Sequence, residues 1–441
     1  MLRVALAAAL GAAACDRAAE APPYEVWVLD QSDSPGHDHG GTLHVYDAAA
    51  LTDTGTAAPV PRLRVDLSGA TAALCRERTG AAPVRPHMVR FNAAESHAIL
   101  AFVASGHVVF LDAESGEPVD CLRATRSATG QQAHAAYPTP DGRFVLVANQ
   151  NGKRLERITV DYDSAVFAAD SAALLDLATC TTPAGEPCEA PQLRPDNAPV
   201  CPYMSRGGLA FVTLRGGGLL VVDVRDTPMR IVAAYDSARV KGNGCGGVEV
   251  SGQMYVNAGG RPGVLEHMEP YGFSVYRFPL EQFDDRAGPL PPNSPAPEVI
   301  WSVEGAHDSH GMIATPNERY VWVFDRHGDV AEIFETESGE HVGTVRLNGT
   351  LTDNAAPDIA ATAPAGDHVF VALRGPTPLS GDPHNATGST PGLGIIAVED
   401  GGRRGRLTRI IRMSSVRDGI ERADPHSVAV RVRAAPSAAG R

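Results

Sequence analysis

The chain has 441 residues, including 45 glycines and 34 prolines, and carries a formal net charge of -14 at pH 7. A chain this acidic repels nucleic acid unless a basic patch intervenes, and its longest basic stretch, residues 401–409, suits a solvated turn, so we expect no nucleic-acid partner. The glycines and prolines are spread evenly, which favours many short strands joined by tight turns and argues against long helices.

Residues 1–15 are expected to be a targeting segment outside the fold. Arg3 gives a basic start, residues 4–14 are apolar, and small residues lead up to Cys15. The apolar run is too short to span a bilayer. This pattern resembles a bacterial lipoprotein signal, and the resemblance implies export to the periplasm or the outer cell surface, with membrane contact only through a lipid on Cys15. Residues 16–23 would then form a short tether. An ordinary secretory signal, in which Cys15 is incidental, is the alternative.

Short strands with alternating apolar residues are predicted from residue 24 onward. The first three lie in residues 24–30, 41–51 and 62–67. A fuller pattern follows, in which strands that begin at His87 and His97 lead to the turn AESGEPV at residues 113–119. These elements are typical of an antiparallel β structure.

The fuller pattern recurs along the chain. The turn TESGEHV at residues 336–342 nearly repeats that at 113–119, and a third clear copy occupies residues 134–161. Weaker copies span residues 202–224, 246–260 and 357–375. Each copy predicts up to four short strands, which is the pattern of one blade of a β-propeller.

The strands at the two ends of the chain together form one more blade. The N-terminal strands lack a first strand, and residues 424–432 form a lone first strand without companions. We therefore predict an all-β fold, one seven-bladed β-propeller over residues 24–433, closed by the C-terminal strand within the N-terminal blade. Closure removes an unpaired sheet edge. Residues 434–441 are expected to be a disordered tail, and six or eight blades stay open if a weak copy is misassigned.

The residues that open the first strands are candidate metal ligands. The first strand of a blade is innermost, so its opening residue should lie at one mouth of the central channel. Five adjacent blades open with His310, Asp358, His426, His87 and His134. Neutral imidazoles that converge in this way are suited to copper or zinc. The alternative is that these histidines cap strands through hydrogen bonds to backbone and fill a polar channel without metal.

A family resemblance adds to this interpretation. The turn PDGR at residues 140–143 and the following FVLVANQNGKRLERI resemble bacterial surface and periplasmic propellers of the YVTN-repeat type. The pattern is also similar to the propeller domain of nitrous oxide reductase and related copper propellers, in architecture over most of the chain and in only a few residues per blade. That resemblance implies copper bound by His87, His134, His310 and His426.

Other polar residues extend the candidate site. His37 and His39, in the segment SPGHDHGG, would join the metal ligands if their loop folds over the channel mouth. Arg215, Arg374 and Asn149 end second strands that run back to this mouth, and guanidinium groups there are suited to holding a small anion or molecule. If the protein is an enzyme, we expect a metal-dependent oxidoreductase.

Three other functions stay open at this point. One is a non-catalytic envelope propeller that binds proteins or another ligand through its long loops, and another is a periplasmic metal carrier that uses His37 and His39. A lactonase with a calcium-centred propeller would need several inward carboxylates, for which the chain offers Asp30, Asp325 and Asp358.

Six cysteines remain after Cys15, an even number that suits three disulfides in an exported chain, although six cysteines permit 15 pairings. One pair should join blades 4 and 5, one should clip the insertion at residues 163–200, and one should tie the start and end of blade 2. The expected pairs are Cys201 with Cys245, Cys180 with Cys188, and Cys75 with Cys121.

Overall fold

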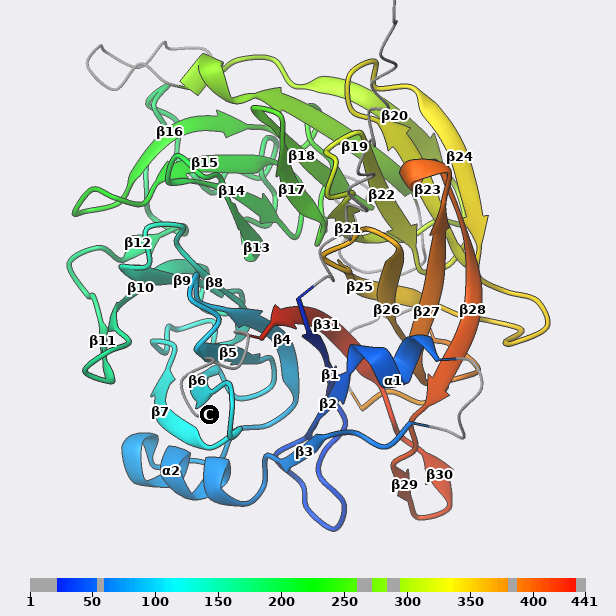
Figure 1. Ribbon diagram of the computed structural model, residues 1–441. Helices are drawn as coiled ribbons and strands as arrows, with labels where there is room; N and C mark the ends of the chain where they lie inside the picture. Colours follow the sequence, from blue (N-terminus) through cyan, green and yellow to red (C-terminus); the bar gives the residue numbers. More distant parts are fainter. Residues whose placement is uncertain (1–21, 54–58, 260–271, 284–293, 380–386, 434–441) are drawn as a thin grey trace, which may run out of the picture.

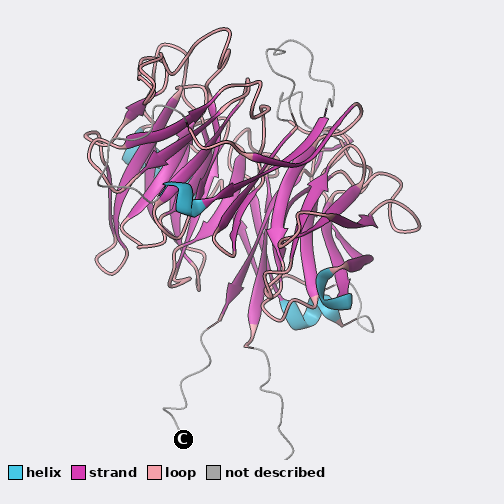
Figure 2. Ribbon diagram, turned by 90° about the horizontal axis from the view of Figure 1, so that it is seen from above, coloured by secondary structure: helices cyan, strands magenta, loops and turns pink. Residues whose placement is uncertain are grey.

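The computed structural model describes residues 22–53, 59–259, 272–283, 294–379 and 387–433. Within these ranges the chain forms seven antiparallel sheets of four or five strands around a common centre and one separate two-stranded hairpin, and helices are few and short (Figures 1 and 2). The predicted all-β, seven-bladed propeller is therefore confirmed. The predicted targeting segment with Cys15, most of the tether, and the tail at 434–441 lie outside the described residues.

Six of the blades have four strands and blade 3 has five, and the strands are named from the centre outward. Blade 1 contains β31 (Pro425–Val432), β1 (Tyr24–Asp30), β2 (Thr42–Asp47) and β3 (Leu63–Asp66). Blade 2 contains β4 (Pro86–Phe91), β5 (His97–Phe102), β6 (His107–Asp112) and β7 (Pro118–Arg123). Blade 3 contains β8 (Ala133–Pro138), β9 (Phe144–Asn149), β10 (Arg154–Asp161) and β11 (Val166–Ala169), with β12 (Leu175–Asp176) also paired to β10. Blade 4 contains β13 (Pro199–Met204), β14 (Leu209–Leu214), β15 (Leu219–Asp223) and β16 (Arg230–Tyr235).

The remaining blades follow the same plan. Blade 5 contains β17 (Gly247–Val250), β18 (Gln253–Ala258), β19 (Gly272–Pro279) and β20 (Glu298–Glu304). Blade 6 contains β21 (Ser309–Ala314), β22 (Tyr320–Asp325), β23 (Val330–Glu335) and β24 (His341–Arg346). Blade 7 contains β25 (Pro357–Thr362), β26 (His368–Leu373), β27 (Gly392–Glu399) and β28 (Arg404–Arg412). The elements outside the blades are α1 (Ala48–Thr52), α2 (Ala70–Thr79), the short helices η1 (Leu280–Phe283) and η2 (Asp400–Gly402), and the hairpin of β29 (Val416–Arg417) and β30 (Ile420–Glu421).

The ring is closed by the last strand, as predicted. Strand β31 pairs antiparallel with β1, from Tyr24 opposite Val432 to Asp30 opposite Pro425. Each innermost strand also contacts that of the next blade, in the order β31, β4, β8, β13, β17, β21, β25 and back to β31. Figure 1 shows these strands gathered around the centre. Closure places the two ends of the described chain in one sheet, that of blade 1, so that β1 is paired on both sides and has no open edge.

Packing between neighbouring blades explains the burial of the strands. The middle strand β22 is buried along its whole length, because adjacent sheets cover both of its faces. The outer strand β20 contains only partly buried and exposed residues. Trp27 and Trp322 are fully buried, and the indole nitrogen of Trp322 donates a hydrogen bond to the carbonyl oxygen of Gly402 at 2.8 Å. The indole thus packs in the core without leaving its polar group unsatisfied.

Helix α2 was not anticipated from the sequence. It begins after Gly69 and ends at Gly80, whose φ of 78° is in the left-handed region that favours glycine at a helix C-terminus. The helix contacts β7, and Cys75 on α2 forms a disulfide with Cys121 on β7. Among the described residues, no helix is both long and apolar enough to cross a membrane.

Candidate metal centre

The innermost strands of five neighbouring blades bring four histidines and one aspartate together at the channel. We call this set the histidine cluster, and it consists of His310, Asp358, His426, His87 and His134. All five residues are buried. Their places in the sequence repeat predicted that they would meet, and the structure places them side by side.

A β-bulge sets the direction of each of these side chains. In blade 2, Pro86 lies opposite Phe102 and Met88 lies opposite Ala101, so His87 is an extra residue without a cross-strand partner. The innermost strands show a similar shift in register at His134, His310, Asp358 and His426. A bulge interrupts the strict alternation of a strand and re-aims a side chain. The repeated bulge therefore turns the opening residues toward the channel.

The imidazole rings are in contact with one another. The ring centroids of His87 and His426 lie 3.6 Å apart, and those of His87 and His134 lie 4.5 Å apart. The His310 and His426 centroids are separated by 5.7 Å. In His310, Asp358 and His426, one potential ligand atom from each lies within 4.8 Å of the other two. These three residues form a group of possible metal donors within the histidine cluster.

Hydrogen bonds fix the tautomers of two rings. The Nδ1 atom of His426 lies 2.8 Å from the carbonyl oxygen of His87, which can only accept, so Nδ1 carries the proton. The Nδ1 atom of His87 lies 3.0 Å from the amide oxygen of Gln31, whose amide nitrogen donates to Asp424 at 2.6 Å. In both neutral rings the lone pair is then on Nε2.

Several polar atoms of the histidine cluster are unsatisfied. The Nε2 atoms of His87 and His426, both ring nitrogens of His310 and Oδ1 of Asp358 have no hydrogen-bond partner among the described residues. The Nε2 atom of His310 lies 3.1 Å from Oδ1 of Asp358, yet the two atoms are not aligned for a hydrogen bond. Buried polar atoms are rarely left without a partner, and a site for an ion is one of the usual reasons.

Burial and nearby positive charges keep His87, His310 and His426 neutral. Burial, followed by the positive charge of Arg326, lowers the pKa of His310 to about 3. Burial also holds the pKa values of His87 and His426 well below the ordinary value. Neutral imidazole is the form that binds metals.

Asp358 is held as a carboxylate. Burial opposes its ionisation, but the neighbouring His310 and the positive charges of Arg326 and Arg374 outweigh burial and lower its pKa to about 2. Arg374 donates to Oδ2 at 2.7 Å, and Arg326 lies 3.4 Å from the same oxygen. Both guanidinium contacts leave Oδ1 facing the imidazoles.

The residues predicted to bind substrate have protein partners. Arg374 is fully buried between Asp358 and Asp424, and it donates to the two oxygens of Asp424 at 2.6 and 2.7 Å. Asn149 donates to Thr125 and Glu156 at 2.8 and 2.7 Å. Both side chains already bind protein groups, so these contacts do not support the prediction that Arg374 and Asn149 bind substrate.

Arg215 is the more exposed of the two predicted arginines, and its Nε atom donates to Asp196 at 2.6 Å. His37 and His39 lie 5.0 Å apart between ring centroids, and His39 contacts Asp38 and Arg76 through its two nitrogens. Within the described residues, the groups of possible metal donors do not include His37 or His39.

The charged groups behind Asp358 were not predicted from the sequence. Arg326 pairs with Asp308 at 2.8 Å, and Asp308 precedes the strand that carries His310. Burial raises the pKa of Asp308 to about 7. Asp308 lies two residues before His310, and this short spacing is the feature of the sequence that could have indicated a charged group near the cluster.

The three disulfides join the predicted pairs, Cys75 with Cys121, Cys180 with Cys188, and Cys201 with Cys245. The third disulfide links blade 4 to the segment that leads into blade 5.

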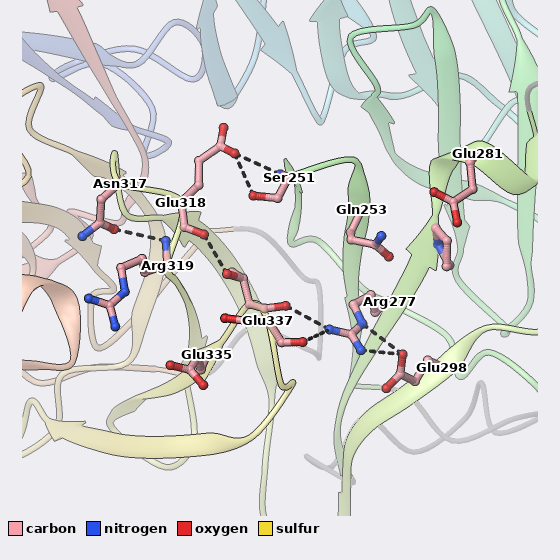
Figure 3. Close-up of a pocket in the computed structure, with 12 residues that line it drawn as sticks. Ser251, Gln253, Arg277, Glu281, Glu298, Asn317, Glu318, Arg319, Glu335 and Glu337 are labelled. Carbon is pink, nitrogen blue, oxygen red and sulfur yellow. Dashed lines mark hydrogen bonds and ion pairs between the residues drawn. The ribbon is translucent and has the colours of Figure 1, made fainter.

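A cavity of about 610 Å³ lies between blades 5 and 6, away from the histidine cluster (Figure 3). Five glutamates line it. Figure 3 shows a hydrogen bond between Ser251 and Glu318 and an ion pair between Arg277 and Glu298. None of the residues that line this cavity belongs to the histidine cluster.

Comparisons with known proteins identify the fold. No protein-family model and no curated protein matches the chain. A hypothetical selenium-binding protein from Sulfolobus tokodaii has a TM-score of 0.57 at 11% identity, with 93% of this chain and 94% of that chain covered. A protein from Lactobacillus plantarum has a TM-score of 0.57 at 9% identity, with 92% and 99% covered. The periplasmic gluconolactonase of Pseudomonas aeruginosa has a TM-score of 0.54 at 13% identity, with 92% and 100% covered. Identities this low show a shared propeller fold alone.

Proposed function

We propose that the protein is an exported, lipid-anchored β-propeller that binds copper or zinc in its histidine cluster and presents the metal to a small molecule or anion at the channel mouth. The observation that carries this proposal is the set of buried lone pairs without hydrogen-bond partners on His87, His310, His426 and Asp358. A metal ion would satisfy several of these atoms at once.

The chemistry of the donors suits a transition metal. Two or three imidazole nitrogens and one carboxylate oxygen match the donor sets of zinc sites that keep an open position, and imidazole also suits copper. Two histidines with one carboxylate occur in iron(II) sites as well, so elemental analysis has to identify the ion. A bound ion of this kind polarises an oxygen of its substrate or changes redox state.

A calcium-centred lactonase is a weaker candidate for this chain, although one of its fold neighbours is named a gluconolactonase. Calcium takes six to eight oxygen ligands. Asp30 and Asp325 accept hydrogen bonds from backbone N–H groups, and Asp358 is the one carboxylate of the histidine cluster. A donor set dominated by nitrogen favours copper or zinc.

Export is supported by the cysteines. Three disulfides within one chain suit an oxidising compartment. The lipid on Cys15 rests on the sequence pattern alone. An envelope location would also supply the small anions or molecules, or the envelope proteins, that we propose as partners.

Metal content is the test of the proposal. The purified chain, stripped with a chelator and then equilibrated with Cu(II) or Zn(II), is expected to retain about one equivalent of metal. The double variant His310→Ala/His426→Ala should lose this metal. The control His107→Gln, a change at a buried histidine in β6, should retain it.

Two results would overturn the proposal. One is a wild-type chain that binds neither ion, and the other is equal binding by wild type and the double variant. A loss of metal in His37→Ala/His39→Ala, with full binding in the double variant, would favour the metal carrier instead.

A further inference from the structure

The disulfide between blades 4 and 5 lies against a histidine of the cluster. Cys201 lies in β13, and Cys245 lies two residues before β17. The Nδ1 atom of His134 is 3.9 Å from the sulfur of Cys201. The two sulfurs and one nitrogen of His134 all lie within 4.8 Å of one another.

This arrangement is buried and specific to one of the three disulfides. Cys201 is 0% exposed, Cys245 is 1% exposed and His134 is 5% exposed. Among the described residues, neither of the other disulfides belongs to a comparable group of metal donors. Cys201 also lies within the register shift of blade 4, between Pro199 and Pro202.

We propose that Cys201 and Cys245 form a redox-switched ligand pair, which on reduction creates a second metal site with His134. A dithiol reductant supplies two electrons and two protons, the sulfur–sulfur bond breaks, and two thiols form while the reductant becomes a disulfide. When a divalent ion binds, both thiols release their protons and ligate as thiolates. In the disulfide form these sulfurs are not thiolate ligands, so the site exists only in the reduced protein.

The donor set defines the class of ion. Two thiolates with one imidazole make a soft site that suits Zn(II) or Cu(I), in contrast to the nitrogen and oxygen donors of His310, Asp358 and His426. Zinc–sulfur bonds of about 2.3 Å in a tetrahedral site separate two sulfurs by about 3.8 Å. The cysteines already have their Cα atoms 5.7 Å apart, so this spacing requires a small movement of the side chains.

The two sites are neighbours, but the inference does not depend on the proposed function. His134 contacts His87, with ring centroids 4.5 Å apart. A soft site at Cys201, Cys245 and His134 would exist in the reduced protein even if the other residues of the cluster bound no metal.

Cobalt(II) is the probe for this site. The full chain is reduced with tris(carboxyethyl)phosphine under anaerobic conditions, desalted, and titrated with Co(II). We expect thiolate-to-cobalt charge-transfer absorption that saturates at about one equivalent, and no such band in the oxidised chain. The band should disappear in Cys201→Ser/Cys245→Ser and persist in Cys180→Ser/Cys188→Ser, the matched control in another disulfide. His134→Ala should weaken Co(II) binding at least about tenfold.

Equal charge-transfer bands in the reduced wild type and in Cys201→Ser/Cys245→Ser would overturn the inference, as would the absence of a band in the reduced wild type. A readout on the wild type alone covers the case in which the serine variant does not fold. In the reduced wild type, zinc should slow the alkylation of Cys201 and Cys245 by iodoacetamide more than the alkylation of Cys180 and Cys188. Peptide masses follow the reaction at each cysteine. Equal slowing at all four cysteines would contradict the site.

The variant His310→Ala/His426→Ala separates this inference from the proposed function. It should lose the metal bound by the oxidised chain and keep the charge-transfer band of the reduced chain.

Discussion

The Nδ1 atom of His426 donates a hydrogen bond of 2.8 Å to the backbone carbonyl oxygen of His87, so the last strand of the chain is tied to the opening of blade 2. This contact joins residues 339 positions apart in the sequence. It fixes the proton on Nδ1 and leaves the lone pair of Nε2 directed away from the backbone. Ring closure thus prepares His426 as a ligand, in the way that outer hydrogen bonds orient metal-binding histidines.

Gln31 should act as a positioning residue for the metal. Its amide oxygen accepts from Nδ1 of His87, and its amide nitrogen donates to Asp424. We expect Gln31→Ala to lower zinc affinity about 10-fold to 100-fold, the usual cost of losing an outer partner of a ligand. Competition with a chelating dye measures this affinity. The control Asn92→Ala removes a buried amide at the β4–β5 turn and should leave affinity unchanged. Equal affinities for wild type and Gln31→Ala would contradict the role.

Arg374 should be essential to the stability of the closed ring. It is fully buried and pairs with Asp358 and Asp424, which are also fully buried. Arg374→Met leaves two buried carboxylates without this cation, and we expect the free energy of unfolding to fall by about 3–5 kcal/mol. Adding Asp424→Asn should restore part of the loss, because one of the two charges is then removed. Urea unfolding of the three proteins measures these values, and a loss below about 0.5 kcal/mol in Arg374→Met would be inconsistent with this role.

His107 should make stability depend on pH. It is buried between Ser105 and Thr79, with both ring nitrogens 2.8 Å from a hydroxyl oxygen. Burial, with a smaller effect of Arg123, lowers its pKa from 6.5 to about 4. The unfolded chain therefore takes up a proton more readily, so the contribution of His107 is complete above pH 6.5 and is lost as the pH falls toward 4.

The variant His107→Gln tests this pH dependence. Between pH 7 and pH 5, the free energy of unfolding of the wild type should fall by about 1–2 kcal/mol more than that of the variant. Urea unfolding at the two pH values gives the difference. Parallel pH profiles for the two proteins would show that the protonation of His107 is not linked to folding.

The sequence predicted the fold because the blades repeat a pattern of period two between recognisable turns. The same repeat aligned His87, His134, His310 and His426 at the openings of the innermost strands. It could not predict the bulges that aim these side chains, because a bulge depends on the register between two strands and leaves little signal within either. Strict alternation alone would have placed each ring on one face of its blade.

Apart from the short spacing between Asp308 and His310, the sequence gives little indication of the charged network behind the histidine cluster. Arg326 contacts Asp308 and Asp358, which are 18 and 32 residues away, and nothing local to Arg326 distinguishes it from an exposed arginine at a turn. The contacts of Arg374 with Asp424, 50 residues away, likewise form only when blades 7 and 1 close the ring. The pairs of Asp358 with Arg326 and of Asp424 with Arg374 join different blades, so a pattern within one blade cannot reveal them.

The most direct measurement is anomalous diffraction from crystals of the full chain equilibrated with Cu(II) or Zn(II), recorded at the absorption edge of the metal. We predict one strong peak among Nε2 of His310, Nε2 of His426 and Oδ1 of Asp358, with His87 as the nearest additional nitrogen donor. A peak confined to His37 and His39, or no peak within bonding distance of the histidine cluster, would contradict a metal centre in the channel.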